Sequence, residues 1–170
     1  EIKVSPDITI NDQVKEDKVL NKKSENSVDS EIYNLSYEKF DLYNNIYLIQ
    51  AQKGIVNNDT PNIILMHGVK ASITYENNEK LLINCKRAVF NKVNFENKFF
   101  DNVEVIFQDQ KLRSDSLDFL FDKNIAIFKD NVRYQNIDTK MFSDKITINI
   151  ITKEIEITSK NKSDRIKVEK

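Results

Sequence analysis

The stretch that decides the fold is LIQAQKGIV, residues 48–56, because three later segments repeat its pattern. They are LINCKRAVF at 82–90, KLRSDSLDF at 111–119 and KMFSDKITI at 140–148. Each copy has a small residue in fourth place. A glycine or an apolar residue follows three positions later, and another apolar residue comes two positions after that. The small residues are Ala51, Cys85, Ser114 and Ser143, at spacings of 34, 29 and 29.

A second phrase closes the first three units: HGVKA at 67–71, DNVEV at 101–105 and DNVRY at 130–134. A period of roughly 20 to 50 residues is typical of repeat architectures, in which each unit buries its apolar face only against its neighbours. The sequence therefore predicts a row of similar units that share one continuous core.

Alternating apolar and polar residues predict strands almost throughout 31–157. In 69–76, for example, Val69, Ala71, Ile73 and Tyr75 alternate with polar residues, the period of a sheet with one wet face. No segment of helical length carries an amphipathic stripe. Only 2 Gly and 2 Pro are available for turns, so asparagine, which tolerates positive φ, is expected to form them. We predict an all-β fold, a long antiparallel meander of strands of roughly five to eight residues.

The domain boundaries follow from composition. Residues 1–30 are rich in charges and amides and are predicted to form a disordered or extended tether, with a short edge strand at 8–10 as an option. The β domain is expected over 31–160, followed by a tail at 161–170. No run approaches the roughly 20 apolar residues that span a bilayer. The chain begins with Glu1 rather than Met, so we expect that an anchoring or targeting segment preceded it.

Charge and reactive residues exclude several functions. The net charge is −1, so no overall field attracts nucleic acid or an anionic membrane. With 1 Cys and 1 His, the chain lacks the usual ligands of a zinc site, and no cofactor is expected. Cys85 takes the place of Ala or Ser in the other units and is interpreted as a packed small residue. His67 belongs to a turn phrase, and Asp115 and Asp144 occupy solvated positions, so we predict no enzyme.

Four segments carry a resemblance to a known family. Residues 48–56 followed by 65–71, and 112–119 followed by 130–134, resemble the repeated "L-x-A-D-x-G-x-Y … G-N-V-x-V" pattern of the OstA-like lipopolysaccharide transport proteins. The polar N-terminal stretch, then a strand pair and the repeats, is most similar to the family's inner-membrane-anchored component. The resemblance implies a twisted, V-shaped, open β-jellyroll of about fifteen antiparallel strands.

In that family, the acyl chains of lipid A lie in an apolar groove between the two halves of the jellyroll. A groove suits acyl chains because burial is worth roughly 0.8 kcal/mol per methylene. The residues expected to line it here are Val56, Val69, Ala71, Ile73, Phe90, Phe99, Val103, Val105, Phe107, Phe119, Phe121, Ile127, Val132, Tyr134 and Ile148.

The resemblance also implies partners and a location. The expected partners are lipopolysaccharide, the inner-membrane ABC transporter complex that extracts it, and a soluble bridge protein that pairs edge to edge with this chain. A homodimer through the sheet edges is a further option. The expected location is the periplasm, with an N-terminal inner-membrane helix ahead of Glu1. The edge expected to meet the bridge protein carries Ile146, Ile148, Ile150, Ile155 and Ile157.

Alternatives of three kinds stay open. The chain could be the soluble bridge protein itself, or the periplasmic domain of the outer-membrane partner, since both share the fold. It could be a β-repeat adhesin or assembly scaffold whose apolar faces are fully packed and bind no lipid. A β-solenoid enzyme acting on carbohydrate would need a carboxylate cluster, which the sequence does not provide.

Overall fold

The computed structural model describes residues 29–152, 154–158 and 167–169, which form one sheet of ten strands. The strands are β1 (Ser30–Phe40), β2 (Ile46–Val56), β3 (Ile63–Thr74), β4 (Lys80–Asn91), β5 (Asn97–Phe107), β6 (Gln110–Leu120), β7 (Ile125–Gln135), β8 (Lys140–Asn149), β9 (Ile155–Thr158) and β10 (Lys167–Glu169). A 3-10 turn, η1 (Phe121–Lys123), joins β6 to β7. The predicted tether and the strand at 8–10 lie outside the described residues, apart from positions 29 and 30.

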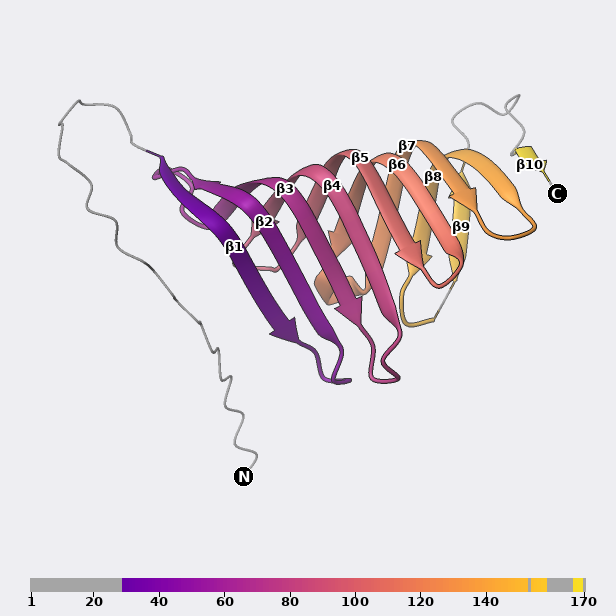
Figure 1. Ribbon diagram of the computed structural model, residues 1–170, viewed down its shortest axis with the longest axis horizontal. Helices are drawn as coiled ribbons and strands as arrows, with labels where there is room; N and C mark the ends of the chain where they lie inside the picture. Colours follow the sequence, from indigo (N-terminus) through magenta and orange to yellow (C-terminus); the bar gives the residue numbers. More distant parts are fainter. Residues whose placement is uncertain (1–28, 153, 159–166, 170) are drawn as a thin grey trace.

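The strands follow one another in chain order, each antiparallel to the next, from β1 to β8. Figure 1 shows this succession along the long axis of the molecule. β8 then pairs with both β9 and β10 on its far side. β10 lies within the predicted tail, so part of that segment also joins the sheet. Among the described residues no helix has the length and apolarity needed to cross a membrane.

The predicted all-β meander is confirmed, but its strands are fewer and longer than expected. The first eight described strands have 10 to 12 residues, whereas strands of five to eight residues and about fifteen in number were expected. The closing phrase that contains His67 was interpreted as a turn. In the structure the chain continues through it as one bent strand.

The sheet folds over on itself along a line through the middle of its strands. Tyr37 belongs to a cross-strand row that continues through Ile49 and Ala71 to Ile83 on β4. Phe90 lies seven residues further along β4, a distance of roughly 23 Å in a flat strand. The rings of Tyr37 and Phe90 are nevertheless 4.9 Å apart between centroids. The two halves of the sheet therefore face each other across a shared apolar interior.

Left-handed backbone marks the fold line. Gly68 has φ 63°, Asp101 and Asn102 have 62° and 58°, and Asp130 and Asn131 have 60° and 53°. These residues belong to the second repeated phrase, and β5 and β7 lose their regular register at the same level. Asn, Asp and Gly adopt this conformation at lower cost than other residues. The phrase therefore specifies a bulge that bends the strand.

The repeated small residue completes the bend from the neighbouring strand. Each one pairs with the valine of a closing phrase. The side chains of Cys85, Ser114 and Ser143 each donate a hydrogen bond to the carbonyl two residues onward, at 3.1, 2.8 and 3.5 Å. Cys85 thus makes the same contact as serine. Burial raises its pKa to about 11, so the thiol is protonated at neutral pH, in keeping with the interpretation as a packed small residue.

Asparagine forms the turns, as predicted. Asn44, Asn78 and Asn124 have positive φ at strand connections. At other turns an asparagine carbonyl accepts from backbone N–H groups further along the chain: Asn136 from residues 138 and 139, and Asn149 from residues 151 and 152. These side chains satisfy donors that tight turns would otherwise leave unpaired.

Candidate functional site

The interior between the two halves of the sheet has two unlike regions. Near β1 and β2 it is nearly filled by five aromatic rings, which we call the aromatic plug: Tyr37, Tyr47, Phe90, Phe95 and Phe121. Between β3–β6 on one side and β6–β9 on the other it contains an open cavity of about 330 Å³. Beside the plug the remaining space is only about 50 Å³.

The plug joins the two halves of the sheet ring by ring. Tyr37 lies 4.9 Å from Phe90 and 6.0 Å from Phe95, between centroids, and Tyr47 lies 4.6 Å from Phe121 in an edge-to-face arrangement. Such geometries add about 0.5–1.5 kcal/mol per pair beyond the burial of area. Phe95 and Phe121 come from the connections after β4 and β6, so two loops of one half reach across to the other.

Lys39 lies over two rings of the plug. Its Nζ lies 3.6 Å from the centroid of the Phe95 ring and 4.0 Å from that of Phe121. A cation over two ring faces is attracted by the quadrupole of each ring. Phe95 itself has φ 57°, which is rare for a bulky side chain and costs free energy. This strained backbone places the ring beneath Lys39, so the contacts of the plug outweigh the strain.

A polar network supports the plug at the β1–β2 turn. Tyr47 Oη donates to Asp41 Oδ2 at 3.1 Å, and Asn45 donates to the same carboxylate through its side chain at 2.8 Å. Burial raises the pKa of Tyr47, and the charge of Asp41 raises it further. Burial alone would raise the pKa of Asp41, but hydrogen bonds from Asn45, Tyr43 and Tyr47 hold it below its usual value. Tyr47 thus stays protonated and fixed against Phe121.

The open cavity is almost wholly apolar. It is lined by Tyr75, Leu81, Ile83, Val105, Phe107, Gln110, Leu112, Leu117, Phe119, Ala126, Phe128, Ile148, Ile150 and Ile155. Ile155, on the outermost strand β9, is 61% exposed, whereas Leu117 at the floor is 1% exposed. The cavity therefore opens toward the β9 side of the sheet. Its lining residues carry no charge, and its only side-chain polar groups are the Tyr75 hydroxyl and the Gln110 amide.

This composition selects a chemical class of occupant. The backbone N–H and C=O groups around the cavity are engaged in the sheet ladders. A peptide placed inside would lose water from its own polar groups without finding partners, at a cost of several kcal/mol. A hydrocarbon chain has no such groups and gains from burial. The cavity is therefore suited to hydrocarbon rather than to polypeptide.

The outer surface of the bend offers a contrasting polar hollow of about 750 Å³, with Lys86, Glu104 and Arg113 among its lining residues. Two polar contacts lie within its lining: Arg113 Nε lies 2.7 Å from Glu104 Oε2, and Asn131 donates to Asp115 Oδ2 at 2.5 Å. Within the described ranges no three His, Cys, Asp or Glu residues gather as a metal site would require.

The structure brings most of the predicted groove residues to the inner face, but it divides them. Val105, Phe107, Phe119 and Ile148 line the open cavity. Ala71, Ile73, Phe90, Phe99 and Phe121 lie around the plug. Val69, Val103 and Val132 are buried beneath the bend at 1–2% exposure. Val56 and Tyr134 pack against the core at its margins.

The expected inward position of Ile127 is wrong. Ile127 pairs with Asp118 on the outer face, while its neighbours Ala126 and Phe128 are buried. At the bulge, Asp130 and Asn131 of β7 stand against Asp144 alone on β8, one extra residue. The buried residues of β7 keep even numbers on both sides of it. Counting back from Val132 therefore leads to Phe128 and Ala126, not to Ile127.

The predicted partner edge is also altered. Ile146 and Ile148 lie on β8, where they pair with Ile157 and Ile155 of β9, so they are not on a free edge. Ile150 is buried at 9% exposure. Ile155 and Ile157 remain at the outermost described position of this side.

Several lining residues were missed by the sequence analysis: Tyr75, Leu81, Ile83, Gln110, Leu112, Leu117, Ala126 and Phe128. A signal for three of them was available. Leu117 occupies the position three beyond the small residue, and its counterparts Gly54, Ala88 and Ile146 are all buried. Phe128 and Ala126 follow from the parity argument above. Gln110 carries no sequence signal, because its role depends on what faces it.

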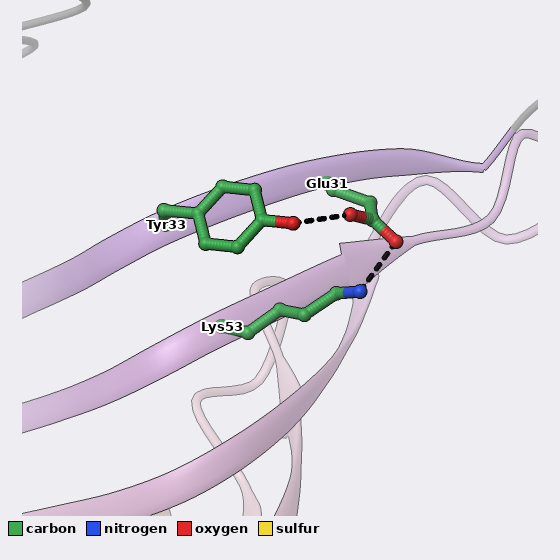
Figure 2. Close-up of polar contacts among 3 residues, drawn as sticks. All are labelled: Glu31, Tyr33 and Lys53. Atoms are coloured by element: carbon green, nitrogen blue, oxygen red, sulfur yellow. Dashed lines mark hydrogen bonds and ion pairs between the residues drawn. The ribbon is translucent and has the colours of Figure 1, made fainter.

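The opposite edge of the sheet, β1, has its own polar cluster. Figure 2 shows the Glu31 carboxylate between two partners: Tyr33 Oη donates to Glu31 Oε2 at 2.7 Å, and Lys53 Nζ lies 2.5 Å from Oε1. The hydrogen bond from Lys53 lowers the pKa of Glu31, with a second contribution from Tyr33. All three side chains are on the outer face, so the cluster ties β1 to β2 without entering the interior.

Comparison with known proteins finds likenesses of structure but not of sequence. No family model matches the sequence, and no curated protein matches it. The fold is similar to the crystal structure of LptH, described as the LptA-homologous periplasmic component of the lipopolysaccharide transport device of Pseudomonas aeruginosa. The TM-score is 0.54 at 10% identity, over 72% of this chain and 92% of that chain. At this identity the likeness establishes the shared fold, an open β-jellyroll.

Proposed function

We propose that this chain is a non-enzymatic periplasmic component of lipopolysaccharide transport, which holds the acyl chains of lipid A in its interior. The observation that carries the proposal is the uncharged cavity of about 330 Å³, lined by apolar side chains inside a jellyroll and open on the β9 side. The sugars and phosphates stay outside, because the interior offers them almost no polar partners. The fold shared with LptH adds support.

Within that role, we favour the LptC-like member. It would be anchored in the inner membrane by a helix preceding this chain, receive lipid from the Lpt ABC transporter complex and pass it to an LptA-like bridge protein by edge-strand pairing. The motif order of the sequence supports this choice. An LptA-like bridge protein and the periplasmic domain of the outer-membrane partner are the alternatives within the same fold. Sequencing upstream of Glu1 in the native gene decides between an anchor helix and a cleavable signal.

Photocrosslinking tests the lipid-binding proposal. A photoreactive amino acid at Val105 or Phe128 faces the cavity, whereas the same group at the neighbouring outer positions Glu104 or Ile127 faces away. We expect lipopolysaccharide adducts from the first pair only, in cells that export lipopolysaccharide. Equal labelling from both pairs, or none from Val105 and Phe128, would count against a lipid conduit and favour a packed β-repeat scaffold.

A further inference from the structure

The inner cavity has a defined end. Ile83 and Phe119 line both the open cavity and the small space beside the aromatic plug, so they form the partition between the two. Behind the partition, the Phe119 ring lies 6.2 Å from that of Tyr47, between centroids, and Tyr47 in turn contacts Phe121. A chain entering on the β9 side therefore meets a wall that the whole plug supports.

On the proposed function, we infer that Phe119 is an end stop that limits the length of hydrocarbon chain this protein accommodates. The open cavity on one side of this ring has a volume of about 330 Å³, and the space beside the plug on the other side has about 50 Å³. Phe119 is 6% exposed and pairs with Asn97 and Ala126 on its two sides. Its position, rather than the length of the sheet, sets the depth of the site.

Two substitutions move the stop in opposite directions. Phe119→Ala removes the ring and joins the two spaces, so longer chains should fit. Ala126→Phe, beside Phe119 in the same cross-strand row, fills part of the open cavity and should shorten the site. Ile127→Phe is the matched control, since Ile127 is adjacent in sequence but lies on the outer face.

The test is isothermal titration calorimetry with single-chain saturated amphiphiles that share one headgroup and are kept below micelle-forming concentrations. Over chains of about 6 to about 18 carbons, affinity should rise about fourfold for each added methylene until the chain reaches the stop. The chain length at which affinity levels off should be longer in Phe119→Ala, shorter in Ala126→Phe and unchanged in Ile127→Phe. Circular dichroism confirms that each variant is folded. If Phe119→Ala does not fold, the chain length at which affinity levels off in Ala126→Phe still tests the end stop.

A levelling-off length that neither variant changes, in protein that binds the chains, would overturn the end stop and leave the proposed function intact. If the wild-type protein binds no chain of any length, both proposals fail.

Discussion

The plug and the open cavity lie in one interior, between the same two halves of one sheet, yet one is nearly filled by side chains and the other is not. Both are built from alternating apolar residues on bent strands. They differ in whether rings from the two halves meet across the gap. Rings from Phe95 and Phe121 reach across to Tyr37 and Tyr47, whereas the rings that line the open cavity, such as Tyr75 and Phe107, leave space between the halves. The hydrophobic pattern builds the interior, and contacts between rings decide where it is filled.

The largest expected effect is on the free energy of unfolding, and it should differ between two phenylalanines that are equally buried. Phe90 and Phe128 are each 2% exposed, but Phe90 packs against Tyr37 and Phe95, while Phe128 borders the open cavity. Phe90→Ala should lower the free energy of unfolding by about 3–5 kcal/mol, because it removes close contacts and creates a void. Phe128→Ala should cost less, since part of its surroundings is already empty. Urea denaturation measures both, and equal losses would contradict the contrast between the regions.

Enlarging two buried alanines to leucine should change the stability in opposite directions. Ala88 is 2% exposed in close-packed surroundings and Ala126 lines the cavity. Ala88→Leu should destabilise by about 1–3 kcal/mol through overpacking. Ala126→Leu should stabilise by about 0.5–2 kcal/mol, as cavity filling commonly does. Thermal unfolding followed by circular dichroism gives the sign of each change, and destabilisation by Ala126→Leu would mean that the cavity is not open in solution.

A smaller effect is expected from the cation above the plug. Lys39→Met keeps most of the apolar stem and removes the charge over Phe95 and Phe121. The loss should be about 1 kcal/mol, the range of cation–π contacts that are partly shielded from water. Lys39→Arg should restore most of the stability, because guanidinium also stacks on ring faces. The comparison of the two variants in urea separates the charge from the packing of the stem.

The smallest effect lies outside the interior, at β1. The hydrogen bond from Lys53 lowers the pKa of Glu31 in the folded protein. The contact therefore stabilises the folded state at pH values above the unfolded pKa of Glu31, near 4.5. This stabilisation is lost as the pH falls through the lowered pKa of the folded state. Carbon-detected NMR titration should place the midpoint of Glu31 below 4.5. Lys53→Met should raise that midpoint toward the usual value, while high salt should reduce the shift by screening. If Lys53→Met leaves this midpoint unchanged, the ion pair with Lys53 does not lower the pKa of Glu31.

The repeat made much of this architecture predictable. The period of 34, 29 and 29 residues identified the strand units, the small residues marked one side of each bend, and Gly68, Asn102 and Asn131 marked the other. The turns were predictable because asparagine is the residue that this glycine-poor chain uses for positive φ. The inward face was correct wherever the alternation ran unbroken, as at Val103, Val105 and Phe107.

Errors arose where a bulge intervened. On β7 the buried residues keep even numbers through the bend, whereas on β6 they change from even to odd, from Leu112 and Ser114 to Leu117 and Phe119. Local sequence does not show which of two paired strands keeps its alternation. Ile127 was misplaced for this reason, and the same uncertainty hid Phe128. The phrase around His67 was also taken for a turn, whereas it lies within β3.

The sequence by itself determined the all-β class, the position of each bend and the residues that turn the chain, because these depend on local backbone preferences. Only the tertiary structure decided where the interior is closed and where it is open. That outcome depends on pairs such as Tyr47 and Phe121, far apart in the chain, whose rings meet only after the sheet has folded over. Whether two such side chains touch depends on the size and position of both, so the sequence around either one does not predict the contact.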